Sequence, residues 1–152
     1  MPNILATMAH SPAIASDYLG FNRALAGGTI LAPLREQIAL AVGQANECEY
    51  CVSAHAALGV SAGLTADDVA AARRGDATDE RNNAALSFAR QLVDSRGIVS
   101  DADIEELRLS DFSDGQVTEI VANVAINVFT NYFNHVARTE VDFPAVAPLE
   151  AF

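Results

Sequence analysis

Two cysteines and a histidine lie close together in this 152-residue chain. Cys48, Cys51 and His55 fall within the segment CEYCVSAH, which contains both cysteines of the sequence. If this segment is helical, the three side chains share one face, at positions i, i+3 and i+7. Cys51 then lies between a second thiol, which can close a disulfide, and an imidazole, which can accept a proton. These residues at this spacing are suited to thiol redox chemistry.

A cysteine that reacts at neutral pH needs a base or a positive environment, because an ordinary thiol has a pKa of about 8.5. His55 can supply the base, and Glu36 on the preceding apolar segment can fix the tautomer of His55. The identity of the attacking cysteine is open. The neighbouring His55 favours Cys51, whereas a helix N-terminus would stabilise a thiolate at Cys48. We favour Cys51 as the attacking cysteine and Cys48 as the resolving one.

The same residues allow a second interpretation, a zinc site. Cys48, Cys51 and His55 form a C-x-x-C-x-x-x-H pattern with three possible ligands. A fourth ligand would have to be His10 or His135, because the chain has no further cysteine. We therefore expect neither a metal nor another cofactor.

The composition excludes several classes of partner. The net charge is −11, with 9 Lys and Arg against 20 Asp and Glu, which disfavours nucleic acid. No apolar run approaches the roughly 20 residues that span a membrane, and the N-terminus MPNILATMAHSP lacks the features of a signal peptide. We expect a cytoplasmic protein, in which a C-x-x-C pair is more often catalytic or metal-binding than structural.

The pattern of apolar residues predicts a single all-α domain, 1–152, of six or seven helices. No strand-like alternation occurs, whereas N-capping residues and helical periodicity recur along the chain. The C-x-x-C pair is expected at the start of a buried helix, which Gly59 would end. The segment 141–152 contains two prolines and is expected to form an extended arm. The expected helices cover residues 12–27, 34–45, 48–59, 65–73, 78–96, 100–109 and 113–138.

Four asparagines recur at helical spacing in the last expected helix, at positions 123, 127, 131 and 134. Buried amides need hydrogen-bond partners. These side chains could bond to other helices or across a subunit interface, or they could line a cavity at the redox site. In the second case Asn127 and Asn131 become supporting pocket residues, together with Tyr50.

The motif resembles the alkylhydroperoxidase D-like, or carboxymuconolactone decarboxylase-like, superfamily. The resemblance rests on Glu36, eleven intervening residues, Cys48-x-x-Cys51, three residues and His55; the ending NYFNHVARTEVDFP is similar to peroxidase-related members. It implies an all-α fold assembled into homo-oligomers, either trimers or hexamers. It also implies an alkyl hydroperoxide reductase in which Glu36 and His55 relay a proton from Cys51. Peroxide would oxidise Cys51 to a sulfenic acid, Cys48 would close the disulfide, and a lipoyl-bearing or thioredoxin-like dithiol would reduce it.

One position departs from the resemblance. Tyr50 replaces the histidine that often precedes the second cysteine, and a phenol titrating near pH 10 cannot shuttle protons at neutral pH as imidazole does. Two other enzymatic functions therefore stay open. The first is a general dithiol-disulfide oxidoreductase that uses the same residues. The second is a decarboxylase of the carboxymuconolactone type, although that branch generally works without a C-x-x-C pair.

Overall fold

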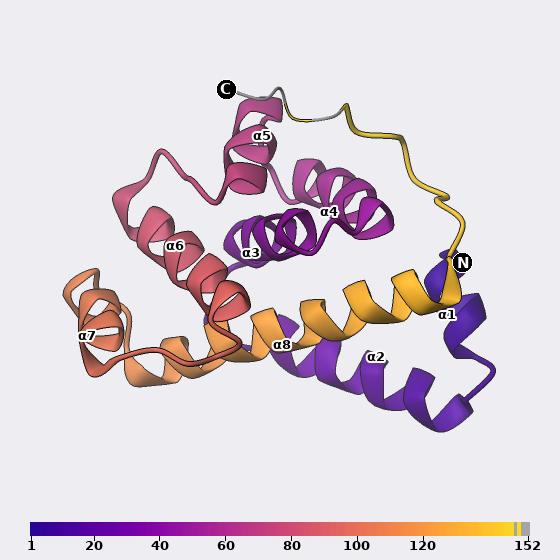
Figure 1. Cartoon of the computed structure of the whole chain (residues 1–152), viewed down its shortest axis with the longest axis horizontal. Helices are drawn as coiled ribbons and strands as arrows, with labels where there is room; N and C mark the ends of the chain where they lie inside the picture. The colour runs from indigo at the N-terminus through magenta and orange to yellow at the C-terminus, as the bar shows by residue number, and fades with distance from the viewer. Residues whose placement is uncertain (148, 150–152) are drawn as a thin grey trace.

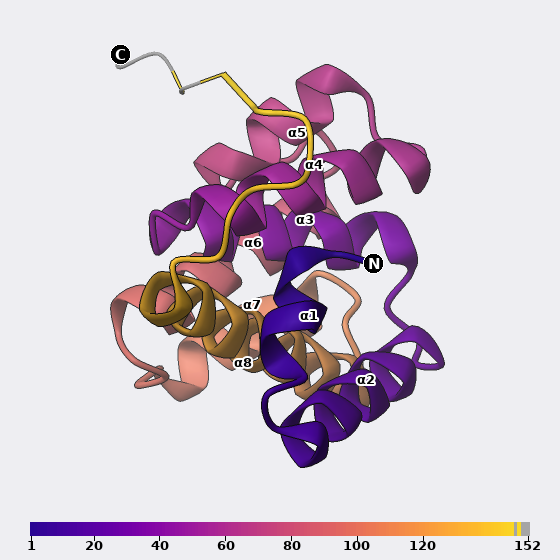
Figure 2. The same cartoon turned by 90° about the vertical axis from the view of Figure 1, so that its right-hand side faces the viewer.

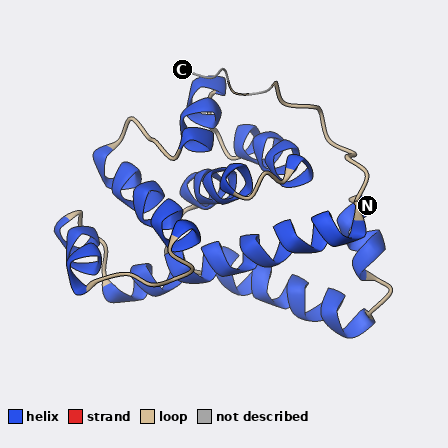
Figure 3. Cartoon of the chain, in the orientation of Figure 1, coloured by secondary structure: helices blue, strands red, loops and turns tan. Residues whose placement is uncertain are grey.

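The computed structural model describes residues 1–147 and 149, in which every regular element is a helix (Figures 1 and 3). The predicted all-α fold is therefore confirmed, with eight helices in these residues instead of six or seven. They are α1 (Asn3–Met8), α2 (Pro12–Ala26), α3 (Ala32–Ala45), α4 (Glu49–Ser61), α5 (Ala66–Arg74), α6 (Glu80–Asp94), α7 (Asp101–Leu109) and α8 (Asp114–Ala137). None of the helices in the described residues is long and apolar enough to cross a membrane.

Side-chain caps set the starts of most later helices, as expected from the sequence. In each of three capping boxes, the first side chain accepts from the backbone N–H three residues later, and the second side chain accepts from the first residue's N–H. These reciprocal bonds satisfy amides that the first helical turn leaves without partners. The boxes are Thr65 with Asp68 on α5, Ser100 with Asp103 on α7, and Ser113 with Gln116 on α8.

The additional helix is α1, which sequence patterns did not indicate. It has six residues and no side-chain cap, so local signals for it are weak. Its stability comes from tertiary contacts instead, because Ile4 and Met8 are buried in a cluster with Cys48, Cys51 and Ala54. The first turn of the chain is therefore part of the surroundings of the cysteines.

The prediction that Gly59 ends the cysteine helix was wrong. Helix α4 continues to Ser61, and Gly63, with φ of 100°, adopts the left-handed conformation that follows it. Gly59 is buried inside the helix, where a Cβ atom would lie 2.9 Å from Leu64 Cδ1 and 3.7 Å from Glu36 Cβ. The glycine permits close packing here and does not terminate the helix.

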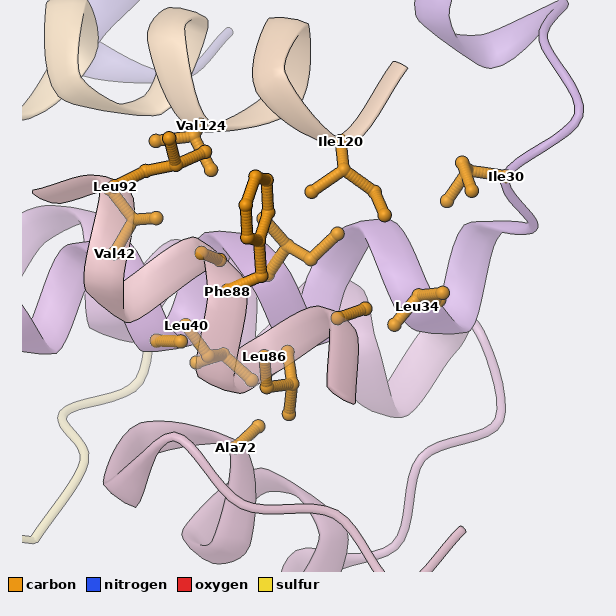
Figure 4. Packing of buried hydrophobic residues seen from close by; sticks show 14 of the residues in the cluster. Ile30, Leu34, Leu40, Val42, Ala72, Leu86, Phe88, Leu92, Ile120 and Val124 are labelled. Carbon is orange, nitrogen blue, oxygen red and sulfur yellow. The ribbon is translucent and has the colours of Figure 1, made fainter. Parts of the chain in front are cut away.

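Helix α3 is the centre of the fold, packed against α4, α5, α6 and α8. Its residues 38–42 are almost wholly buried, as its apolar character on all sides predicts. Figure 4 shows the ring of Phe88 of α6 pointing toward α8, between Val124 and Ile120, with Val42 of α3 in the same cluster. This large cluster packs α6 and α8 against α3.

A smaller apolar cluster and several hydrogen bonds join the two ends of the chain. The Asn3 backbone N–H donates to Asp142 (2.9 Å), and the Asn3 side-chain amide donates to the Glu140 carbonyl (3.0 Å). Farther along, Arg73 of α5 donates to the Ala147 carbonyl at 2.8 Å. The segment after α8 therefore runs past α4 toward α5 without regular structure, as Figure 2 shows. Part of the predicted arm 141–152 lies outside the described residues.

A carboxylate on α8 fixes the loop between α2 and α3. Glu119 accepts hydrogen bonds from the backbone N–H groups of Thr29 and Ile30 at 2.8 Å, and from the Thr29 hydroxyl at 2.9 Å. Partial burial raises the pKa of Glu119, but these hydrogen bonds outweigh it and leave the pKa below its ordinary value. The charged form of Glu119 therefore stabilises the start of α3.

We expect Glu119→Gln to lower the free energy of unfolding by about 1 kcal/mol at neutral pH, because the amide accepts these bonds less strongly than a carboxylate. The folded-state pKa of Glu119 is depressed, so its contribution is present above the ordinary value of 4.5 and disappears as pH falls through the folded-state pKa. Urea unfolding at pH 7 and in acid would measure the difference. Glu105→Gln, in an exposed pair with Arg108, is the control, with a change of about 0.5 kcal/mol or less. If Glu119→Gln lowered the free energy of unfolding equally at both pH values, the assignment would be contradicted.

Candidate active site

The turn between α3 and α4 places the cysteines at a helix N-terminus. Asn46 ends α3, Glu47 adopts φ of 54°, and the Cys48 N–H donates to the Gly43 carbonyl at 2.9 Å. Cys48 is the N-cap of α4, and its sulfur accepts from the Cys51 N–H at 3.3 Å. The expected location of the pair at the start of a buried helix is therefore confirmed.

The two cysteines form a disulfide, with their Cα atoms 5.3 Å apart. Both are buried, Cys48 with 1% and Cys51 with 2% of its surface exposed. Cys51, but not Cys48, is among the residues that line the adjoining cavity. A small molecule in that cavity would therefore meet the Cys51 side of the disulfide.

His55 and Glu36 form a close pair across the two antiparallel helices. His55 Nδ1 lies 2.7 Å from Glu36 Oε2, and both side chains are partly buried. An ionised carboxylate only accepts hydrogen bonds, so the pairing favours the tautomer with a proton on Nδ1. His55 Nε2 is then left as the basic nitrogen. The base and orienting carboxylate expected from the sequence lie in contact.

The cavity at Cys51 has a volume of about 190 Å³ and mostly apolar walls. Its polar side chains include those of His55, Thr130 and Asn134. A second cavity, of about 210 Å³, shares Tyr18, Asn22, His55 and Thr130 with the first and adds Glu36, Arg35 and two asparagines of α8. The imidazole therefore borders an apolar cavity at the disulfide and a more polar one at Glu36. The apolar walls of the first cavity are Pro2, Ile4, Leu5, Tyr18, Leu19, Tyr50, Ala54, Leu58 and Phe143.

Tyr50 belongs to the apolar wall. Its hydroxyl accepts from the Ile4 N–H at 3.2 Å, and its ring meets Phe143 edge-on with centroids 5.7 Å apart. Burial raises the pKa of Tyr50 to about 12, with a further upward contribution from the nearby Asp142. The phenol therefore stays protonated at neutral pH and fastens α1 and the C-terminal segment over the cysteines.

The asparagines of α8 have separate surroundings. Asn123 and Asn127 donate to carbonyls one turn earlier in their own helix, and both border the second cavity. Asn131 is fully buried, accepts from Asn46 at 2.8 Å and is absent from the lining of either cavity. Asn134 donates to Cys51 Sγ at 3.3 Å. Neither sequence-based interpretation holds for the whole row.

Sequence reasoning singled out the row of amides without identifying which of them reaches the sulfur. It also missed Tyr18, whose pKa is raised by burial and by the charge of Glu36, although a hydrogen bond with Asn22 opposes the rise. Ile4, Leu5 and Phe143 were missed as cavity walls because they come from the two ends of the chain.

In the part of the chain that the structure describes, no group of three His, Cys, Asp or Glu residues is arranged to hold a metal ion. The zinc hypothesis gains no support from this arrangement.

Solved structures with the same fold carry related descriptions. An uncharacterized peroxidase-related protein from Ralstonia eutropha JMP134, described as an alkylhydroperoxidase AhpD core, is 30% identical with a TM-score of 0.82, over 93% of this chain and 77% of that one. The debrominase Bmp8, solved alone and, as a cysteine-to-alanine variant, with 2,3,4-tribromopyrrole, is 25% identical with a TM-score of 0.82, over 93% and 78%. A peroxidase-related protein from Silicibacter sp. TM1040 is 25% identical with a TM-score of 0.78, over 97% and 78%.

Sequence comparison agrees with the structural likeness. No curated protein matches the chain. The sequence model of the carboxymuconolactone decarboxylase family matches residues 12–94, a segment that begins with α2, ends with α6 and includes Glu36, both cysteines and His55. The protein therefore belongs to the carboxymuconolactone decarboxylase family and has an alkylhydroperoxidase D-like fold.

Proposed function

We propose that this protein is a thiol-dependent peroxidase that reduces organic hydroperoxides. The observation that carries the proposal is that Cys51, in a disulfide with Cys48, lines an apolar cavity together with His55, which is paired with Glu36. An apolar cavity suits the organic part of a hydroperoxide, and the imidazole suits the proton transfers of thiol oxidation. The peroxidase-related structural neighbours support the same class of reaction.

In the first half of the cycle, Cys51 attacks as a thiolate after His55 has taken its proton. The sulfur bonds to the terminal peroxide oxygen, the O–O bond breaks, and the leaving alkoxide takes a proton from His55 to become an alcohol. Cys51 becomes a sulfenic acid, and the peroxide is reduced by two electrons. Glu36 holds the imidazole in the required tautomer and stabilises its protonated form.

In the second half, Cys48 attacks the Cys51 sulfur, water leaves, and the disulfide forms. Cys48 is suited to this role because its sulfur accepts the Cys51 backbone N–H at the N-terminus of α4, where a thiolate is stabilised. The structure corresponds to this oxidised state. A lipoyl-bearing or thioredoxin-like dithiol then returns two electrons, and a cytoplasmic location, where such reductants are available, is part of the proposal.

We also propose that residues 1–152 act as one domain within a homo-oligomer, either a trimer or a hexamer. A band of large apolar side chains is exposed on α2 and α8. Single exposed apolar residues are normal on a protein surface, whereas a group of them indicates a contact surface. These helices pack against each other below the rest of the molecule in Figure 1. The exposed residues are Ile14, Leu19, Phe21, Val121, Phe129, Tyr132 and Val136.

The first test is a thiol count on the reduced protein before and after one equivalent of cumene hydroperoxide. The wild type should lose two thiols per chain. Cys48→Ser should form a sulfenic acid that dimedone traps, and Cys51→Ser should react at least about 100-fold more slowly because Cys48, the thiol that it retains, does not line the cavity. If Cys48→Ser is inert and Cys51→Ser is rapidly oxidised, the two roles are reversed. If both wild-type thiols survive, the peroxidase proposal falls, and disulfide substrates of a general oxidoreductase become the next assay.

A second test concerns the paired imidazole. Glu36→Gln places an amide that can donate to His55 Nδ1, which favours the other tautomer and leaves Nε2 without basic character. We expect the rate of peroxide-dependent thiol loss to fall about 100-fold, in the range typical of lost general acid-base catalysis. Glu49→Gln, an exposed carboxylate in the first turn of α4, is the matched control and should stay within about twofold of wild type. Equal effects in the two variants would rule out a specific role for the pair.

A second candidate function is reductive debromination, because the debrominase Bmp8 shares the fold over most of this chain. The aromatic walls Tyr18, Tyr50 and Phe143 suit a flat ring. Two thiols would supply the two electrons that replace a carbon-bromine bond by carbon-hydrogen, with bromide, a proton and the disulfide as the other products. By comparison, the decarboxylase alternative has no use for a disulfide.

Reduced protein incubated with 2,3,4-tribromopyrrole tests this candidate directly. If the debromination function applies, ion chromatography should find about one bromide per chain in the absence of added dithiol, matched by the loss of two thiols. The Cys48→Ser/Cys51→Ser double variant is the control and should release none. Bromide release from the double variant would exclude the cysteines as the source of electrons.

A further inference from the structure

A side chain in the last turn of α8 contacts the cysteine pair. Asn134 Nδ2 lies 3.3 Å from Cys51 Sγ, although the two residues are 83 positions apart in the sequence. Asn134 is 5% exposed and lines the same cavity as Cys51 and His55. The amide is therefore in contact with the sulfur that meets the cavity.

The orientation of this amide follows from hydrogen-bond chemistry. A sulfur in a disulfide has no proton and can only accept, so the Asn134 NH₂ group, and not its carbonyl, belongs beside Cys51. A thiolate is a much stronger acceptor than a disulfide sulfur. The contact therefore strengthens when the disulfide is reduced and Cys51 ionises.

The other end of the same amide lacks a partner. Asn134 Oδ1 is buried, and no hydrogen-bond donor within the described residues reaches it. Buried carbonyl oxygens are normally hydrogen-bonded, so a ligand with an O–H group is the missing kind of partner. In a hydroperoxide, the terminal oxygen that the thiolate attacks carries this O–H group itself.

We infer that Asn134 acts on both reactants: its NH₂ group stabilises the Cys51 thiolate, and its Oδ1 accepts the hydroxyl of the hydroperoxide. The second half of this inference rests on the proposed peroxidase function, whereas the first half does not. A neutral amide suits this position because it donates and accepts at once without titrating. It complements His55, which moves the proton.

The two cysteines thereby differ in their donors. Cys48 receives a backbone N–H within α4, which no side-chain substitution removes, whereas Cys51 depends on a side chain of another helix. Burial in apolar surroundings raises the pKa of a thiol. A donor at Cys51 offsets this effect at the sulfur that meets the substrate.

The thiolate half is tested in a Cys48→Ser background, where the introduced serine still caps the helix and Cys51 is the sole thiol. The pH dependence of iodoacetamide alkylation measures its ionisation. Asn134→Leu should lower the thiolate fraction at neutral pH about three- to tenfold. Asn134→Asp, which replaces the donor by an acceptor and adds a negative charge, should lower it further.

Asn123→Leu is the control. Asn123 is a buried amide of the same helix, but its side chain donates to the backbone of α8. Its thiolate fraction should equal that of the parent. Circular dichroism melting establishes that each variant is folded, and Asn134→Asp, of nearly the same shape, serves if the Leu variant is not. Unchanged ionisation in folded Asn134→Asp overturns the inference.

The hydroxyl half is tested by the rate of sulfenic acid formation with cumene hydroperoxide, divided by the thiolate fraction. This rate per thiolate should fall several-fold in Asn134→Leu and stay near the parent value in Asn134→Asp, which keeps an acceptor oxygen. Equal rates per thiolate in parent and Asn134→Leu would overturn this half. If the Asn134 substitutions shift the thiolate fraction but the parent does not react with hydroperoxide, the first half of the inference is upheld and the peroxidase proposal is refuted.

Discussion

The close antiparallel packing of α3 against α4 is the constraint on which the rest of the site depends. Two glycines lie in this contact, one near each end. A Cβ at Gly43 would lie 3.4 Å from Cys51 Cβ of α4, and one at Gly59 would lie 3.7 Å from Glu36 Cβ of α3, both at van der Waals distance from the facing helix. With the helices this close, Glu36 lies opposite His55, which is one turn before Gly59 in α4. The Glu36 carboxylate and the His55 imidazole lie 2.7 Å apart. His55 is therefore positioned by the packing of α4 against α3.

The same turn determines the electrostatics of the disulfide. Because Cys48 is the N-cap of α4, its sulfur accepts the Cys51 N–H of the first turn, and this end of the helix favours negative charge there. Burial of both residues acts in the opposite direction by removing water. The chemistry of the pair follows from this balance, in which each hydrogen-bond donor near sulfur has a larger effect than it would in solvent.

Much of the fold could be predicted from local signals. Ser113 with Gln116 specified the start of α8, and the helical repeat of Ala85, Phe88 and Leu92 specified the buried face of α6. Helix α1 could not be predicted, since its stability lies in contacts of Ile4 and Met8 with residues forty or more positions away. The prediction that Gly59 ends α4 was wrong for the same reason, because the space around this glycine depends on Leu64 and on Glu36 of another helix.

For the site, the sequence identified Glu36, Cys48, Cys51 and His55 because they lie within 20 positions on two adjacent helices, where spacing converts directly into proximity. It could not distinguish Asn134 from Asn131. Both are buried amides of one helix, yet one contacts Cys51 and the other Asn46, and only the rotation and depth of α8 decide which. Long-range contacts of this kind carry no periodic signal.

This division matters for the reaction. The redox residues come from the α3–α4 hairpin, whereas the apolar cavity walls come largely from α1, α2 and the segment after α8. These walls are fastened by few bonds, Asn3 to Asp142 and Ile4 to Tyr50 among them. Proteins of this fold carry descriptions as different as peroxidase-related protein and debrominase. Since a shared fold does not fix a substrate, we propose that the hairpin supplies the electron and proton chemistry and that the walls from the chain ends set the selectivity.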